Sequence, residues 1–82
     1  MKLSLEVETN VIQVMTRAYE LGKGKPVKRE TIAKSFQHSN RDWCKPYLNL
    51  AVELEWMKRI RRGLYIVTED GKRVIADYQE VA

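Results

Sequence analysis

Residues 40–57 read Asn-Arg-Asp-Trp-Cys-Lys-Pro-Tyr-Leu-Asn-Leu-Ala-Val-Glu-Leu-Glu-Trp-Met and form the longest stretch with helical periodicity in the chain. Apolar side chains spaced i, i+3, i+4 and i+7 share one helix face and predict a core-facing surface: Tyr47, Leu50, Ala51 and Leu54. A second apolar set, Leu48, Val52 and Trp56, widens the arc beyond what a one-sided surface helix needs. We therefore expect this helix to be covered from two directions by the rest of the chain.

Pro46 leaves two interpretations of this stretch open. Inside a helix, proline removes a hydrogen bond and crowds the carbonyl four residues earlier, at a cost of roughly 3 kcal/mol. In the interpretation that we favour, Asn40 caps a helix that bends at Pro46. In the other, a loose turn covers 40–45 and the regular helix begins with Pro46 at its first position, where proline is favourable. Only an unbroken helix places three long polar side chains together opposite the core: Arg41, Lys45 and Asn49.

The length and composition predict a single globular domain, residues 1–82. A chain of 82 residues is too short for two domains, and its hydrophobic fraction of 44% is that of a folded protein. No apolar run approaches the roughly 20 residues that cross a bilayer, and the first residues lack a signal-peptide pattern. One cysteine and one histidine provide neither a disulfide nor a zinc ligand set. We therefore expect a cytoplasmic protein with no membrane contact, metal or cofactor.

The net charge of +4 is unevenly distributed along the chain. Residues 23–62 hold eleven Lys and Arg against four acids, a balance of +7, whereas the two ends together hold four basic residues against seven acids, a balance of −3. Segregation of this kind creates a field that attracts a polyanion, and nucleic acid is the commonest one inside cells. The alternative is a solvated basic face without a ligand.

The remaining patterns predict an α+β, mostly helical fold. Helical spacing alternates with short apolar runs, and Gly22 provides a left-handed residue that ends the first helix. A connection of about three residues joins two helices, as in a helix-turn-helix or an ordinary helical hairpin. The expected elements are a strand or extended arm at 1–7, a helix at 8–21, a strand of one or two residues at Val27, helices at 28–36 and 40–57, a hairpin with strands at 57–61 and 64–68, and a helix at 69–80.

The expected hairpin turns at Arg62-Gly63, a turn-capable pair between β-branched and aromatic residues. Either Leu64 and Ile66 or Tyr65 and Val67 would face the helices. Thr68 then fits the N-cap of the last helix, with acids in its first turn. The tip is strongly basic, because four cationic side chains lie at or beside it: Lys58, Arg59, Arg61 and Arg62.

This order of elements resembles the winged helix-turn-helix family, particularly its small archaeal regulators, over about residues 8–78. The resemblance is most specific from Tyr47-Leu48 through the hairpin to Ile75. Within that range, Tyr65-Ile-Val-Thr-Glu-Asp-Gly71 is similar to the aromatic-x-x-Thr-x-x-Gly step by which the family leaves its wing. It implies a three-helix core, a two-stranded β wing and a C-terminal helix. The sequence departs from the family at Pro46 and at Glu55-Trp56-Met57, where the family usually has a glycine-led step.

The resemblance implies sequence-selective binding of double-stranded DNA, as in a transcription regulator. Helix 40–57 would lie in the major groove and the Arg-rich wing 58–63 on the backbone or in the minor groove. A homodimer is expected, because one small recognition surface supplies limited specificity. By similarity to the family, Ser39, Asn40, Arg41, Lys45 and Asn49 would face the groove and Lys28 and Arg29 would hold the backbone, and the wing adds Arg59, Arg61 and Arg62.

Other classes of function are weighed against DNA binding. The alternative is a protein-interaction module that docks through Leu48, Val52 and Trp56, although such a module has no need for arginines beside a turn glycine. RNA binding and unselective DNA binding are further options. We do not expect an enzyme, since the sequence has no carboxylate pair with an evident shared cleft and no glycine-rich phosphate loop. Cys44 fits a small core residue and His38 a turn residue better than a catalytic pair.

Overall fold

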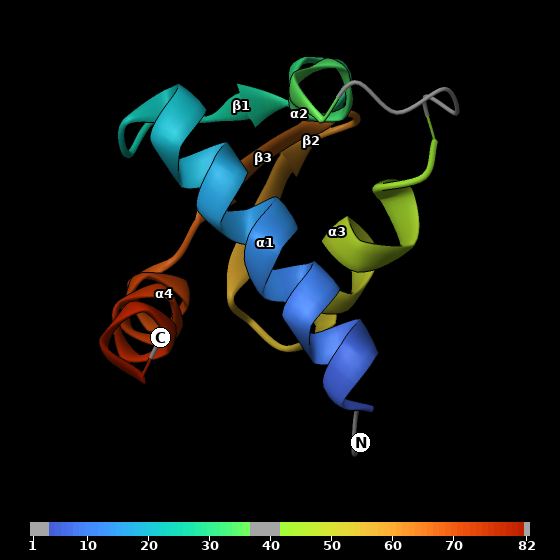
Figure 1. The fold of residues 1–82 in the computed structure, drawn as a ribbon. Coiled ribbons are helices and arrows are strands. Elements are labelled where there is room, and N and C mark those ends of the chain that lie inside the picture. Colours follow the sequence, from blue (N-terminus) through green and yellow to red (C-terminus); the bar gives the residue numbers. More distant parts are fainter. Residues whose placement is uncertain (1–3, 37–41, 82) are drawn as a thin grey trace.

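The computed structural model describes residues 4–36 and 42–81, which form four helices and three strands (Figure 1). The expected α+β, mostly helical class is confirmed. In chain order the elements are α1 (Leu5–Gly22), β1 (Val27–Lys28), α2 (Arg29–Ser35), α3 (Lys45–Glu53), β2 (Met57–Arg61), β3 (Leu64–Val67) and α4 (Glu69–Val81).

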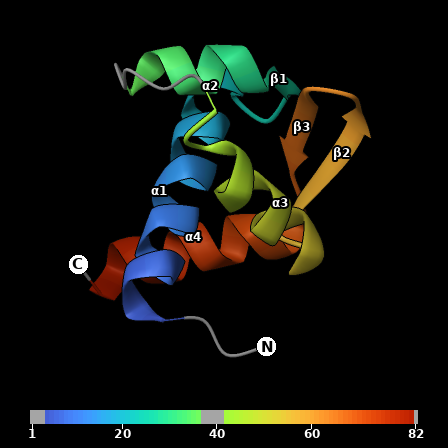
Figure 2. The same ribbon diagram turned by 90° about the vertical axis from the view of Figure 1, so that its right-hand side faces the viewer.

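The three strands form one antiparallel sheet in the order β1-β3-β2. The β2–β3 hairpin is the one that the sequence predicts, and β1 adds a two-residue edge strand to it. Helix α1 contacts the other three helices and β3, so it occupies the centre of the domain (Figure 1). Figure 2 shows the hairpin at the edge of the helical body, with its tip beside β1 and α2.

The core forms where α1 meets the sheet and the other helices. Of the two possible inward faces of β3, Tyr65 and Val67 are the buried pair. The cysteine is also fully buried, as expected for a small core residue. The buried hydrophobic residues are Val11, Ile12, Val14, Met15, Ala18, Val27, Ile32, Ala33, Cys44, Leu48, Ala51, Met57, Tyr65, Val67 and Ile75.

Helix α1 differs from its prediction at both ends. It begins at Leu5 because the Ser4 hydroxyl accepts a hydrogen bond from the Val7 N–H at 3.2 Å, so the expected arm at 1–7 is wrong for residues 5–7. Residues 1–3 lie outside the described residues. At the other end Lys23, with φ 50°, is the left-handed residue. Gly22 has a different role, since a Cβ there would collide with the Val27 side chain.

Helix α3 begins at Lys45, so the favoured interpretation of a helix that bends at Pro46 is wrong. Residues 42–44 form a turn, and Pro46 lies in the first turn of the helix, where its missing N–H has no partner to lose. The helix also ends earlier than expected, at Glu53. Glu55 then adopts φ 64°, and β2 begins two residues later. The predicted range 40–57 therefore combines a turn, a helix and the exit from that helix.

The buried face of the shorter helix takes one residue from each of the two predicted apolar sets. Leu48 and Ala51 are fully buried, whereas Tyr47 and Leu50 pack partly exposed against the core. Leu48 therefore belongs to the core and is not on an exposed docking stripe with Val52 and Trp56.

Candidate functional site

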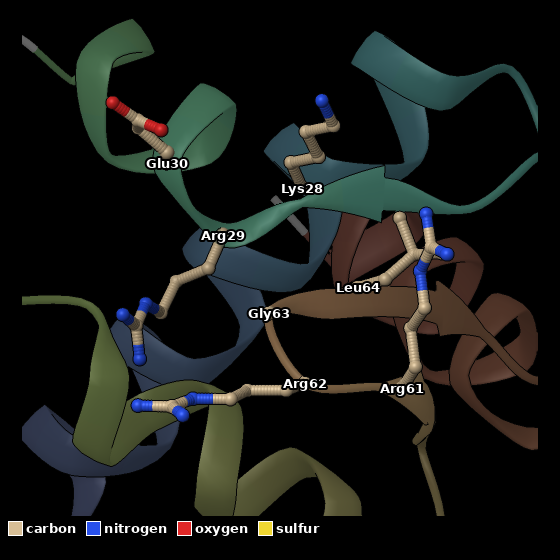
Figure 3. Close-up of a pocket in the computed structure, with 7 residues that line it drawn as sticks. All are labelled: Lys28, Arg29, Glu30, Arg61, Arg62, Gly63 and Leu64. Atoms are coloured by element: carbon tan, nitrogen blue, oxygen red, sulfur yellow. The ribbon is translucent and has the colours of Figure 1, made fainter.

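A hollow of about 330 Å³ lies between the start of α2 and the tip of the β2–β3 hairpin (Figure 3). Its walls come from two segments that are distant in the sequence and were predicted separately to carry basic site residues. Four of the seven lining residues are Lys or Arg and one is acidic: Lys28, Arg29, Glu30, Arg61, Arg62, Gly63 and Leu64. We call this the basic hollow.

Pairing of β1 with β3 holds the two walls together. Lys28 pairs with Leu64 in the antiparallel ladder, and the Arg29 N–H donates a hydrogen bond to the Gly63 carbonyl at 2.8 Å. Gly63 has φ 76°, a conformation that a glycine adopts without a steric penalty. The short strand β1 thus fixes the start of α2 directly beside the hairpin turn.

The register of the sheet places two cations in one row. Lys28 and Arg61 both pair with Leu64, from opposite sides of β3. Residues paired across a sheet project from the same face, and the two strands on either side of a central strand lie about 10 Å apart. Figure 3 shows Lys28 and Arg61 extending to the same side of the hollow. The hollow therefore presents two separated positive charges on either side of an apolar side chain.

Arg59 is not brought to the basic hollow, although the sequence groups it with Arg61 and Arg62. The β2–β3 register shifts between Arg59 and Arg61, so Arg59 pairs with the buried Tyr65 and Arg61 with Leu64. Tyr65 and Leu64 project from opposite faces of the sheet. The shift therefore turns the Arg61 side chain to the face opposite that of Arg59. Arg59 instead borders another hollow beside Glu55. Sequence alternation alone gave no sign of this irregularity.

Arg29 connects the basic hollow to the segment that precedes α3. Its Nη2 lies 3.9 Å from Oδ1 of Asp42, and with side chains 35% and 68% exposed this ion pair contributes at most about 1 kcal/mol. In Figure 3 Arg29 and Arg62 extend toward the same side. The acid in the wall, Glu30, pairs with Lys34 of the same helix at 3.5 Å. Asp42 was missed by sequence reasoning, and it partly offsets the positive charge on this side.

The polar strip expected on the long helix is described only in part. Lys45 and Asn49 are both exposed and lie one turn apart on α3, but neither lines the basic hollow. Ser39, Asn40, Arg41 and His38 lie outside the described residues. Seven of the ten expected site residues are described, and the structure brings together four of them, Lys28, Arg29, Arg61 and Arg62.

An aromatic cluster fixes α3 relative to α1 and α2. The rings of Phe36 and Trp43 meet edge to face with centroids 5.2 Å apart, and those of Trp43 and Tyr47 follow at 5.5 Å. Arg17 of α1 stacks its guanidinium 4.7 Å from the Phe36 centroid, and Asn10 donates a hydrogen bond to the Tyr47 hydroxyl at 3.3 Å. These contacts hold the exposed face of α3 in a defined direction.

The Cys44 thiol is buried in the core. Burial raises the pKa of the Cys44 thiol above its ordinary value of 9.0, which disfavours the nucleophilic thiolate. Residues 4–36 and 42–81 contain no group of three His, Cys, Asp or Glu side chains placed to hold a metal ion. Among the helices of that part, none has the length and apolar character to span a membrane.

Comparisons of this chain with protein-family models, with curated proteins and with solved structures found no match. Guanidinium groups form paired hydrogen bonds to phosphate or carboxylate oxygens, and an ammonium group adds a compact charge. Four such groups on two walls suit an extended anion with several separated negative charges.

Proposed function

We propose that this chain is a winged helix-turn-helix domain that binds double-stranded DNA with sequence preference, as a transcription regulator. The convergence of Lys28, Arg29, Arg61 and Arg62 at one hollow is the observation that carries this proposal. A duplex backbone presents regularly spaced phosphates, and neutralising them releases condensed counterions, which favours binding.

The arrangement of elements supports the winged-helix part of the proposal. The order α1, β1, α2, α3, hairpin and α4 is the order expected for that family, with β2 and β3 as the wing. At the wing entrance, where the family usually has glycine, Glu55 adopts the left-handed conformation that glycine favours. At the exit from the hairpin, the two residues that match the family motif contact each other, since the Gly71 N–H donates a hydrogen bond to Thr68 Oγ1 at 3.1 Å.

The proposed complex assigns different roles to α3 and to the basic hollow. Helix α3 enters the major groove, which is wide enough for a helix, and turns its exposed Lys45 and Asn49 toward base edges. The basic hollow holds the neighbouring phosphates from the start of α2 and from the wing. Phosphate contacts then position the domain and base contacts provide its sequence preference. Homodimerisation, expected from the small recognition surface, stays a prediction.

Docking of a protein partner through Leu48, Val52 and Trp56 is less well supported. Leu48 is fully buried, so it is not available to a partner without unfolding of the core. Trp56 borders a different surface, formed with α1 and α4.

Selection from a pool of random duplexes tests the proposal. We expect enrichment of a common motif, and a higher affinity for the enriched duplex than for a scrambled one. Replacing Lys45 and Asn49 by Ala should reduce that preference by about 1 to 3 kcal/mol for each base that the helix no longer reads. Replacing Lys28 and Arg61 by Ala, a pair in the basic hollow, should weaken both duplexes equally.

Two outcomes would contradict the proposal. Absence of duplex binding at low salt would remove its central claim. Binding without any enriched motif would leave an unselective nucleic-acid-binding protein, and the role assigned to α3 would be wrong.

A further inference from the structure

A second hollow, of about 460 Å³, lies on a different surface of the molecule, between the first half of α1 and the second half of α4. Its apolar lining includes the half-buried Trp56 and Val74 and the fully buried Ile12. Two large apolar side chains at its margin are much more exposed, with Leu5 at 80% and Tyr78 at 39%. We call this the α1–α4 hollow. Exposed apolar groups gathered around a hollow mark a binding surface.

The charges of the α1–α4 hollow restrict what can bind there. Glu8 and Asp77 line it, and none of its described lining residues is Lys or Arg. Packing this surface against the same surface of a second copy would bring four carboxylates together without a cation from either lining. Like charges brought together at an interface cost free energy. The surface therefore favours a partner that is apolar at its centre and basic around it.

The chain itself carries such a segment. Five large apolar side chains are notably exposed among the described residues, and four of them belong to α1 or α4. The fifth is Ile60, 47% exposed, at the register shift of the β2–β3 hairpin. Arg59 and Arg61 flank it in the sequence, and the two residues project from opposite faces of the sheet. Ile60 is thus an exposed apolar side chain on a basic hairpin, with an arginine before it and one after it in the sequence.

We propose that the hairpin of a second copy of this chain docks into the α1–α4 hollow. Ile60 of one copy packs against Trp56 and Val74 of the other, and Arg59, which lies outside the basic hollow, pairs with Glu8 or Asp77. This inference goes beyond the proposed DNA binding and does not depend on it. It gives the predicted self-association a head-to-tail geometry, which differs from two-fold pairing.

The contact is between molecules and not within one. Ile60 follows Trp56 by four residues along an extended strand, about 13 Å away, so it cannot fold back onto the hollow beside Trp56. In Figure 2 the hairpin tip and the crossing of α1 with α4 lie at opposite ends of the domain. A pair formed in this way therefore keeps one free hairpin, on one copy, and one free hollow, on the other. Contacts of this kind extend into open chains unless the rotation closes a ring.

Sedimentation of the untagged chain without DNA, at low ionic strength and rising concentration, tests the proposal. We expect the mean mass to rise beyond that of a dimer, and to return to that of a monomer at high salt, because the arginine–carboxylate pairs are screened. Ile60→Asp should abolish association through the hairpin. The double variant Glu8→Lys/Asp77→Lys should abolish it through the hollow. Leu21→Asp is the matched control, because Leu21 is exposed to a similar degree, 43%, and does not line the hollow.

An equimolar mixture of the two association-deficient variants provides the decisive result. Ile60→Asp retains an intact hollow and Glu8→Lys/Asp77→Lys retains an intact hairpin, so we expect the mixture to form dimers and nothing larger. This recovery also shows that both variants are folded. A wild-type chain that stays monomeric would overturn the proposal. A mixture that stays monomeric would also overturn it. A wild-type dimer that Ile60→Asp leaves unchanged would overturn it in favour of two-fold pairing.

Discussion

Glu55 joins α3 to β2 in a left-handed conformation, with φ 64°. A side chain with a Cβ is strained there by roughly 1 to 2 kcal/mol, whereas glycine is not, although glycine loses more chain entropy on folding. The Glu55 side chain is exposed, so little packing is lost on its removal. We predict that Glu55→Gly raises the free energy of unfolding by about 0.5 to 1 kcal/mol, measured by urea denaturation.

Glu53→Gly is the matched control for this prediction. Glu53 is also exposed but is the last residue of α3, where glycine weakens the helix by up to about 1 kcal/mol. Opposite signs for the two variants are expected. A destabilised Glu55→Gly variant would mean that the glutamate side chain stabilises the fold by more than its backbone strain costs.

Cys44 gives the stability a pH dependence with a defined sign. Burial raises the pKa of its thiol above 9.0, with a smaller contribution in the same direction from Asp42 and opposing ones from its backbone hydrogen bond and from Arg29. The folded chain therefore keeps this proton where the unfolded chain loses it. The contribution of the protonated thiol to the free energy of unfolding is fully present below pH 9 and is lost as the pH rises through the pKa of the folded chain.

We predict that the wild-type chain loses more stability between pH of about 8 and about 10 than Cys44→Ala does. Urea titrations of both proteins at each pH measure this difference, and titration of the other groups cancels in the comparison. Parallel loss in the two proteins would show that the thiol ionises equally well in the folded chain.

At the scale of elements, local signals predicted the hairpin and α4 well. The Arg62-Gly63 turn between alternating apolar residues located both strands, and Thr68 located the start of α4. The predicted range 40–57 was too long, because apolar spacing continues through the turn before α3 and the exit after it. Such spacing reports which side chains are buried, and a turn can bury Cys44 as well as a helix can.

Thr68 connects the first turn of α4 to the segment between α3 and β2 through two hydrogen bonds. Its Oγ1 accepts from the Gly71 N–H at 3.1 Å and donates to the Glu55 carbonyl at 2.7 Å. Thr68→Ala removes both bonds and should lower the free energy of unfolding by about 1 to 2 kcal/mol. Thr68→Ser keeps both and should cost much less. Equal losses in the two variants, measured by thermal or urea unfolding, would assign the effect to packing of the methyl group.

At the scale of the whole molecule, charge distribution located two segments that meet at the basic hollow but did not predict how they meet. Lys28 and Arg29 join Arg61 and Arg62 because β1 pairs with β3, a contact between distant segments that two residues of sequence cannot specify. The separation of Arg59 from Arg61 follows from a register shift that depends on the whole sheet. The hollow between α1 and α4 likewise requires the tertiary arrangement, since its residues come from three separate segments.

The salt dependence of duplex binding tests the proposed function most directly. Log affinity should fall with log salt at a slope of about 0.9 for each phosphate neutralised, so Arg61→Ala/Arg62→Ala should reduce the slope by up to about 1.8 and weaken all duplexes alike. Lys72→Ala/Arg73→Ala removes the same charge from α4, outside the basic hollow, and should leave the slope unchanged. Affinity that does not vary with salt, or equal slope changes in the two double variants, would contradict the proposal that the basic hollow binds the DNA backbone.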